Sequence, residues 1–226
     1  AGGGVRGGDS GDRVRLKILA PMGILAPDPE ERTMTPRVRL IAMLACLGLF
    51  LPAARVPAQT SLTAAETRIA QRVDARAEHA IALLERAVNI NSGTMNFDGV
   101  REVGRLFRAE FDRLGFETTW IDGTPFDRAG HLVARHAGPG PGLLLIGHLD
   151  TVFEPSSAFQ RFERDGDRAT GPGVVDMKGG NVAMVYAFEA LKTLGLLPAM
   201  NVTVVMTGDE ERSGRPSYER LQLIAN

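Results

Sequence analysis

The chain has 226 residues, of which 44% are hydrophobic and 23% charged, and its formal net charge is −1. This is ordinary globular composition, long enough for one domain with a sizeable core or for two smaller ones. A net charge near zero provides no basic footprint for nucleic acid, so we expect no nucleic-acid partner.

The amino-terminal part of the chain has the features of segments that precede a mature domain. Residues 1–33 are rich in Gly, Pro and charge without periodicity, and we interpret them as upstream translation and expect disorder. From Met34, a short basic stretch, an apolar run at 40–51 and small residues ending at Ala58 follow one another. This order is typical of a secretory signal peptide, predicted at 34–58. An uncleaved anchor or a buried helix is the alternative, although about a dozen apolar residues are few for a bilayer.

The mature chain would then be residues 59–226, a periplasmic or secreted protein without a stable membrane span. The single cysteine of the printed sequence, Cys46, lies inside the apolar run and would be removed with it. The mature chain therefore has no disulfide, which an oxidising compartment permits but does not require.

Helices are predicted where apolar residues recur every three or four positions. Residues 63–88 form one such pattern, and residues 97–114 form a second, with Gly115 as its end. A third helix is predicted at 179–194. The first pattern places on one face Ile69, Val73, Ala77, Ile81, Leu84 and Val88, and the second Val100, Val103, Phe107, Phe111 and Leu114.

Short apolar or β-branched runs bounded by turn residues predict strands. The run at 143–147, "LLLIG", shows no alternation, as expected for a strand covered on both faces. Strands alternating with helices predict an α/β fold with a mostly parallel sheet flanked by helices. The expected strands are 116–122, 131–136, 143–147 and 201–207, with a hairpin at 162–170.

Polar residues that can bind metals follow the two most apolar strands. His148 and Asp150 come directly after "LLLIG", and Asp209, Glu210 and Glu211 come after "NVTVVMT". Ligands of open α/β sheets bind outside the carboxyl ends of the strands, so these groups are expected to meet at one edge. A third stretch, "GPGVVDMKGG", brings an aspartate in a glycine-rich loop just before a helix.

An imidazole together with several carboxylates suits Zn²⁺ and related divalent cations. A cation would also offset the mutual repulsion of the consecutive carboxylates at 209–211. Residues 148 and 150 lie on the same side of a strand, so Asp150 can accept the second N–H of the His148 imidazole and orient it.

The stretches "GHLDTV", "GPGVVDMKGG" and "TGDEE" resemble the three signatures of the di-zinc aminoacylase and glutamate carboxypeptidase family of metallopeptidases. That family includes acetylornithine deacetylase and succinyl-diaminopimelate desuccinylase. The resemblance covers roughly residues 64–226, and "NINSGTMN" also looks like the start of the family domain.

The resemblance implies a role for each motif residue. His148 would ligate one zinc ion, Asp176 would bridge two, and Glu211 would ligate the other. Asp150 would orient His148 as part of the catalytic set, and Glu210 would be the general acid/base. Two Zn²⁺ ions are implied for the full-length site, with Co²⁺ or Mn²⁺ as alternatives, and the substrate would be a short peptide or an N-acyl amino acid.

Members of this family continue beyond the third signature with a further acidic ligand, a distal histidine ligand and an inserted dimerisation domain. This chain stops at Asn226. The resemblance therefore implies an amino-terminal fragment of the catalytic domain, one that by itself would not hold two zinc ions or turn over, from a full-length protein expected to be a homodimer. The competing hypotheses are a non-catalytic binding or structural relative of the same fold and an α/β hydrolase with a serine nucleophile, and the chain shows no Gly-x-Ser-x-Gly elbow for the latter.

Several polar residues outside the motifs are interpreted as structural. His79, His131 and His136 lie away from strand ends that face the site, and we expect no metal role for them. Asp209 is expected either to contact residues of the site without binding the metal itself or to be solvated. Lys178 is expected to cap or pair locally, with a substrate contact as the alternative.

Overall fold

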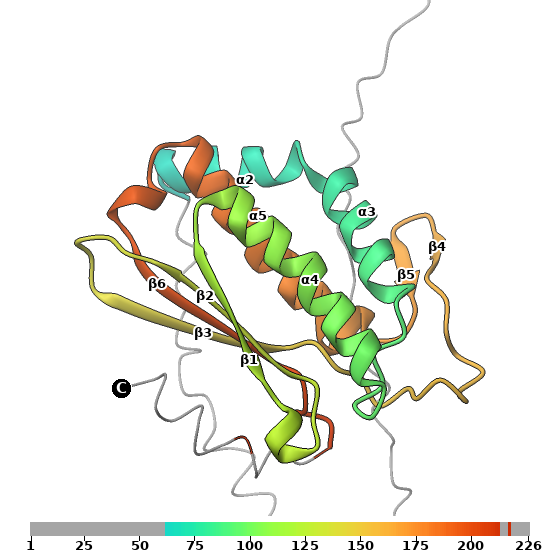
Figure 1. Ribbon diagram of the computed structural model, residues 1–226. Coiled ribbons are helices and arrows are strands. Elements are labelled where there is room, and N and C mark those ends of the chain that lie inside the picture. The colour runs from blue at the N-terminus through green and yellow to red at the C-terminus, as the bar shows by residue number, and fades with distance from the viewer. Residues whose placement is uncertain (1–61, 213–216, 218–226) are drawn as a thin grey trace, which may run out of the picture. The chain divides into compact units, whose positions relative to one another are not determined.

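The structure is a computed structural model that describes residues 62–212 and Ser217. The upstream segment at 1–33 and the signal peptide at 34–58 lie outside the described residues, so their predictions are untested. Within the described part, helices α4 and α5 lie across one face of a four-stranded sheet (Figure 1). No helix in this part is long and apolar enough to cross a membrane.

The sheet confirms the predicted strands and has the order β1-β2-β6-β3. Strands β3 and β6 are parallel, whereas the β1–β2 and β2–β6 pairs are antiparallel. The α/β class is confirmed, but the expectation of a mostly parallel sheet is wrong for these four strands. Only a short turn joins β1 to β2, and a parallel pair needs a longer crossover. The strand bounds are Glu117–Asp122 (β1), Gly130–His136 (β2), Gly142–His148 (β3) and Asn201–Thr207 (β6).

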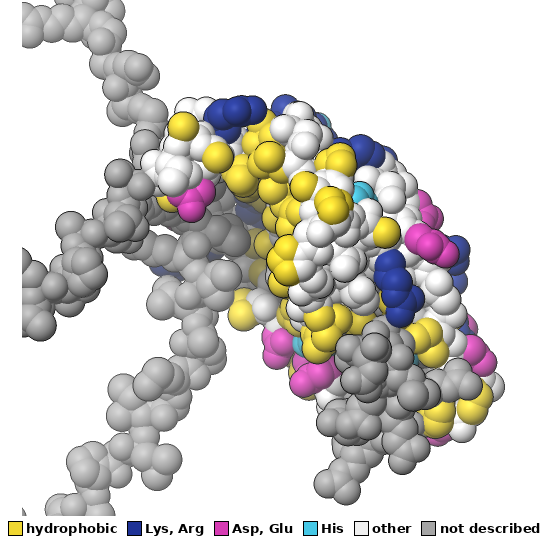
Figure 2. Space-filling view, turned by 90° about the vertical axis from the view of Figure 1, so that its left-hand side faces the viewer, with side chains coloured by type: hydrophobic (Ala, Val, Ile, Leu, Met, Phe, Trp, Pro, Cys, Tyr) yellow, Lys and Arg dark blue, Asp and Glu magenta, His cyan; other side chains and the backbone are white. Residues whose placement is uncertain are grey.

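Strand β3 lies at one edge of this sheet, and its apolar residues are less covered than its sequence predicts. Leu143, Leu144 and Ile146 are 42%, 41% and 66% exposed. Figure 2 shows a face of the molecule on which hydrophobic side chains gather in a band bordered by charged ones. The expectation of a strand covered on both faces is therefore wrong for the part that the structure describes, because β6 pairs with one edge of β3 and the helices cover one face of the sheet.

The first predicted helix is two helices. Helix α2 covers Ala64–Asp74 and α3 covers Ala77–Val88, with a non-helical Arg76 between them. Helix α2 contains no buried residue, whereas α3 buries Leu84 and Val88 as predicted. The break allows the guanidinium of Arg76 to reach the carboxylate of Glu189, at 2.9 Å.

The other helices follow their predicted patterns. Helix α4, Phe97–Leu114, begins where the side chain of Asn96 accepts a hydrogen bond from the Gly99 N–H at 3.3 Å. It ends at Gly115, whose φ of 94° lies in the left-handed region that glycine adopts without strain. Helix α5 covers Gly179–Thr193.

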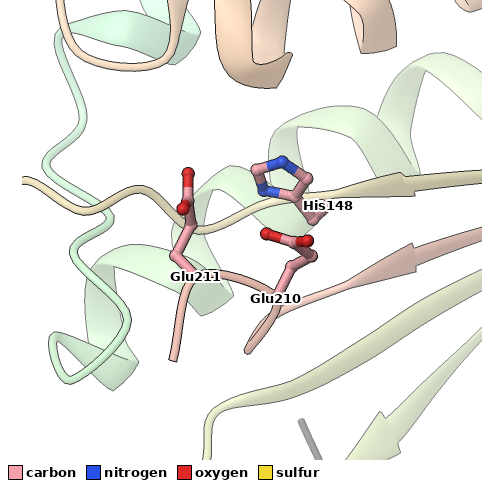
Figure 3. Close-up of side chains that lie close together, drawn as sticks. All are labelled: His148, Glu210 and Glu211. Carbon is pink, nitrogen blue, oxygen red and sulfur yellow. The ribbon is translucent and has the colours of Figure 1, made fainter. Parts of the chain in front are cut away.

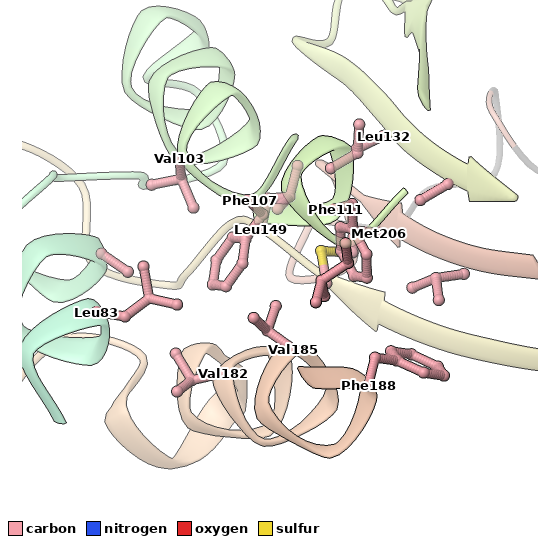
Figure 4. Close-up of a cluster of buried hydrophobic side chains, with 14 of the residues drawn as sticks. Leu83, Val103, Phe107, Phe111, Leu132, Leu149, Val182, Val185, Phe188 and Met206 are labelled. Atoms are coloured by element: carbon pink, nitrogen blue, oxygen red, sulfur yellow. The ribbon is translucent and has the colours of Figure 1, made fainter. Parts of the chain in front are cut away.

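The core lies between these helices and the sheet (Figure 4). Phe107 and Phe111 from α4 and Val185 from α5 are fully buried, as is Met206 from β6. Burial of this apolar surface is the main stabilising contribution to the fold. It fixes α4 and α5 on the sheet and so fixes the ends of β3 and β6.

The predicted hairpin is also present, as an antiparallel pair of β4, Glu163–Asp165, and β5, Arg168–Thr170. Short 3₁₀ turns at Thr124–Phe126 and Leu197–Ala199 complete the connections.

Candidate metal centre

The parallel pairing of β3 with β6 brings the first and third motifs together. His148 at the end of β3 pairs with Thr207 at the end of β6, and the Leu149 N–H donates to the Thr207 carbonyl at 2.7 Å. The residues that follow each strand therefore leave the sheet at the same edge, as the topology of such sheets predicts.

His148, Glu210 and Glu211 form a cluster that could hold a metal ion. Each offers one ligand atom, and these atoms all lie within 4.8 Å of one another. Figure 3 shows the side chains of both glutamates directed towards the His148 imidazole. One nitrogen and two carboxylate oxygens are a suitable donor set for Zn²⁺ or a related divalent cation.

Asp176 reaches the same place from a different segment. It belongs to the short turn Val174–Lys178, in which Asp176 and Met177 depart from helical dihedral angles just before α5. Its Oδ1 lies 2.9 Å from His148 Nε2, and its side chain is 73% exposed. The structure thus brings together all three predicted ligands, although Asp176 lies outside the group of three mutually close ligand atoms.

Asp150 is fully buried next to the cluster and contacts both His148 and the backbone of the two glutamates. His148 Nδ1 lies 3.1 Å from the Asp150 backbone carbonyl and 3.4 Å from its carboxylate. The same carboxylate accepts the backbone N–H groups of Glu210 and Glu211 at 3.2 and 3.1 Å. Asp150 therefore lies where it can orient the imidazole, and it also holds the backbone of the glutamate pair.

Sequence reasoning missed the residues that support this arrangement from neighbouring segments. Thr94 donates its hydroxyl proton to Asp150 Oδ2 at 2.7 Å, and Ser92 donates to the Leu149 carbonyl at 2.9 Å. Asn181, at the start of α5, donates to the His148 carbonyl at 2.6 Å. The stretch "NINSGTMN" was the available signal for the first two, but nothing in it indicates which strand it approaches.

The charges of the cluster shift the ionisation of its members. Burial lowers the pKa of His148, but hydrogen bonds with Asp150 and Asp176 outweigh this and raise it to about 9. Burial also raises the pKa of Asp150, yet its contacts with His148, Thr94 and the Glu211 N–H bring it below its usual value.

Glu211 has a raised pKa, first because of burial and then because neighbouring carboxylates repel its charge. Accumulated negative charge beside an imidazole is the condition that a bound cation relieves. The residues present therefore fit a divalent metal ion.

Of the histidines and the aspartate interpreted as structural, His79 is exposed and the others have local partners. His79 is exposed on α3, and His136 Nδ1 lies 2.9 Å from the Met200 carbonyl. His131 is buried and accepts the Gly208 N–H at 3.2 Å, and burial lowers its pKa. Asp209 is buried rather than solvated, and it accepts the hydroxyl of Ser217 at 2.7 Å.

Comparison with known proteins finds similarity to a peptidase family. Residues 144–222 match peptidase family M20/M25/M40. The chain is 34% identical over 144 residues to carboxypeptidase G2 of Pseudomonas sp. (strain RS-16), which covers 63% of this chain and 35% of that protein. It is 33% identical over 114 residues to succinyl-diaminopimelate desuccinylase of Gluconobacter oxydans, covering 47% and 29%.

Solved structures show the same fold at lower identity. The di-peptidase Dug1p of Saccharomyces cerevisiae superposes with a TM-score of 0.63 at 18% identity, over 71% of this chain and 38% of that one. Human carnosine dipeptidase 1 gives 0.62 at 18% identity, over 70% and 37%. The chain spans about a third of the length of the first curated relatives that it matches, at 35% and 36%.

Proposed function

Because this chain is a relative of peptidase family M20/M25/M40, we propose that it supplies part of the active site of a metal-dependent hydrolase that cleaves an amide or peptide bond. The observation that supports this most directly is the cluster of His148, Glu210 and Glu211 at one sheet edge, with the buried Asp150 behind it.

In this proposal His148, Asp176 and Glu211 would hold the metal, and Asp176 would be shared between two ions. Divalent ions, when bound, supply Lewis-acid polarisation of the scissile carbonyl and make water more acidic. Asp150 keeps the His148 imidazole oriented through Nδ1, leaving Nε2 on the side of Asp176.

Glu210 is the proposed general acid/base. Its backbone is held by Asp150, while its carboxylate remains within reach of the cluster. It would take a proton from the attacking water and return it to the leaving amine, a role that contributes ~10²–10⁴-fold to rate in enzymes. The proposed substrates are short peptides or N-acyl amino acids, in line with the peptidase and desuccinylase relatives.

The experiment compares Glu210→Gln with Glu211→Gln in the full-length protein, measuring turnover and bound metal for each. Glu210→Gln keeps size and polarity but removes the proton acceptor, so we expect activity to fall by ~10²–10⁴-fold with metal content near wild type. Glu211→Gln should lose metal first and recover part of its activity when zinc is added. Glu163→Gln, on the exposed strand β4, is the matched control and should change neither.

The reverse pattern, in which Glu210→Gln loses metal and Glu211→Gln keeps it while losing activity, would exchange the two roles. A wild-type protein that binds divalent metal but hydrolyses no peptide or N-acyl amino acid would support the alternative, a non-catalytic binding relative. A protein that binds no divalent metal would refute the proposal as a whole.

Export and dimerisation are further proposals, based on the pattern at 34–58 and on the family resemblance. Amino-terminal sequencing of the exported protein should begin near Gln59, and a cytoplasmic product that retains Met34 would contradict export. Light scattering of the full-length protein should give twice the chain mass if it dimerises.

A further inference from the structure

Lys178 has a buried amino group close to the proposed metal centre. Its side chain is fully buried, and its Nζ donates to the Ala87 carbonyl at 2.9 Å and to the Ile90 carbonyl at 3.0 Å. Burial lowers its pKa to about 7. A side chain without exposed surface cannot contact a substrate from solvent, so the alternative of a substrate contact is not supported.

One of the two carbonyls that Lys178 contacts, that of Ala87, lies in the last turn of α3, and the other, that of Ile90, lies just after the C-cap residue Asn89. The last carbonyls of a helix have no partner within the helix, and the partial negative charge at this end favours a cation. The amino group of Lys178 therefore donates to both carbonyl groups at this end of the helix. Its stem is also closely packed, because a Cβ added to Gly173 would lie 3.1 Å from Lys178 Cδ.

The backbone of Lys178 closes the turn that carries Asp176. Its N–H, two residues after the aspartate, donates to the carbonyl of Gly173, three residues before the aspartate, at 2.7 Å. The Asp176 side chain itself is mostly exposed, and His148 is its closest polar contact in the described part of the chain. The position of Asp176 thus depends mainly on how the turn is anchored, and Lys178 is the buried anchor.

The segment after α3 holds Asp150 and the residue before it in place. From Asn89 the chain runs through Ser92, which donates to the Leu149 carbonyl, to Thr94, which donates to Asp150. The ammonium of Lys178 therefore joins the start of the segment that supports Asp150 to the turn that carries Asp176.

We propose that Lys178 is a positioning residue for the metal centre, which ties the Asp176 turn to the end of α3 and so sets the affinity for the metal ion that Asp176 helps to hold. This inference rests on the proposed metal-dependent function. Lys178 acts through Asp176 and touches neither substrate nor metal.

The test is Lys178→Met in the full-length protein, which keeps an unbranched side chain of similar length but removes the ammonium. The zinc dissociation constant is measured by competition with a chromophoric chelator, at a temperature well below the unfolding midpoint of each variant. We expect affinity to fall by ~10–100-fold, the range seen when a group that orients a metal ligand is removed. Excess zinc should restore turnover, and KM should stay unchanged because Lys178 does not contact substrate.

Lys192→Met is the matched control. Lys192 also donates its amino group to a carbonyl at a helix end, that of Arg113 in α4 at 2.7 Å, but it is exposed and lies in the last turn of α5, at the opposite end of that helix from the Asp176 turn. This variant should lower thermal stability at most, with unchanged zinc affinity.

Wild-type zinc affinity in a folded Lys178→Met protein would overturn the inference while leaving the proposed function intact. Absence of zinc binding in the wild type would instead refute the proposed function. If Lys178→Met does not fold, Lys178→Gln takes its place, since glutamine keeps a donor but neither the charge nor the full length. The same loss of affinity is expected, and wild-type affinity in Lys178→Gln would overturn the inference equally.

Discussion

Replacing Asp150 with Asn should weaken both the fold and the metal centre. The carboxylate is fully buried and accepts from Thr94 and from the N–H groups of Glu210 and Glu211. Glu210 N–H points at one carboxylate oxygen and Glu211 N–H at the other. Whichever way the Asn amide turns, its NH₂ group therefore faces one of these two N–H donors.

The magnitude follows from this arrangement. One buried N–H left without an acceptor costs about 1–3 kcal/mol. Each of the two remaining hydrogen bonds loses its charged acceptor, and the difference between charged and neutral hydrogen bonds is about 1 kcal/mol. Relief from burying the carboxylate charge offsets part of this loss. The free energy of unfolding should fall by about 2–4 kcal/mol, a large part of the 5–15 kcal/mol that is typical of domains.

The assay is urea denaturation of the metal-free protein, followed by far-ultraviolet circular dichroism, together with zinc affinity by chelator competition. Affinity should fall by ~10–100-fold, because Asp150 also orients His148. Asp98→Asn is the control, since Asp98 is an exposed carboxylate on α4 that pairs with Arg101 at 3.4 Å, and it should change neither quantity measurably. A folded Asp150→Asn protein with wild-type stability and wild-type zinc affinity would refute the reasoning.

Three further predictions concern other parts of the molecule. In Gly104→Ala, the new Cβ would lie 2.4 Å from Trp120 Cζ3, so the ring must move, at a cost of about 1–3 kcal/mol, and the emission of this single tryptophan should shift. In Glu189→Gln, the buried partner of the α2–α3 arginines loses its charge, so trypsin should cleave α2, which has no buried residue, faster than in the wild type. Burial lowers the pKa of His131, so the unfolded chain binds more protons at acidic pH and stability falls as pH drops below about 6.5. In His131→Gln, denaturation of the metal-free protein at pH 7 and pH 5 should show a smaller difference than in the wild type.

Each of these predictions has a result that contradicts it. Unchanged tryptophan emission in Gly104→Ala would mean that the ring is not packed on α4. Equal cleavage of Glu189→Gln and of Glu85→Gln, an exposed control on α3, would mean that α2 does not depend on the buried carboxylate. An equal loss of stability between pH 7 and pH 5 with and without His131 would assign the pH dependence to other groups.

Much of the local structure could be predicted from the sequence because its causes are local. The apolar period of α4, together with Gly115 as its end, predicted a helix whose bounds are confirmed. The strands β3 and β6 were predicted from short apolar runs and lie where expected. The break at Arg76 could not be predicted, because residues 75 and 76 favour a helix and the partner of Arg76 lies on α5, more than a hundred residues away.

The candidate site, like the fold, could be predicted from the sequence only in part. The residue types and their places at strand ends indicated a metal centre with His148, Asp176 and Glu211 as ligands, and the structure brings these side chains to one edge. The number of contacts made by Asp150 was not foreseeable, since its partners Thr94 and Glu210 lie about sixty residues away on either side.

The helices and strands and the ligand-capable residues at their ends follow from the sequence alone, because periodicity, turn residues and ligand types act within a few positions. Which helices and strands are neighbours follows only from the three-dimensional structure. The insertion of β6 between β2 and β3, the exposed edge of β3 and the burial of Lys178 under the Asp176 turn all depend on pairings between distant segments. Such pairings are selected by the burial of a shared core, which no local pattern specifies.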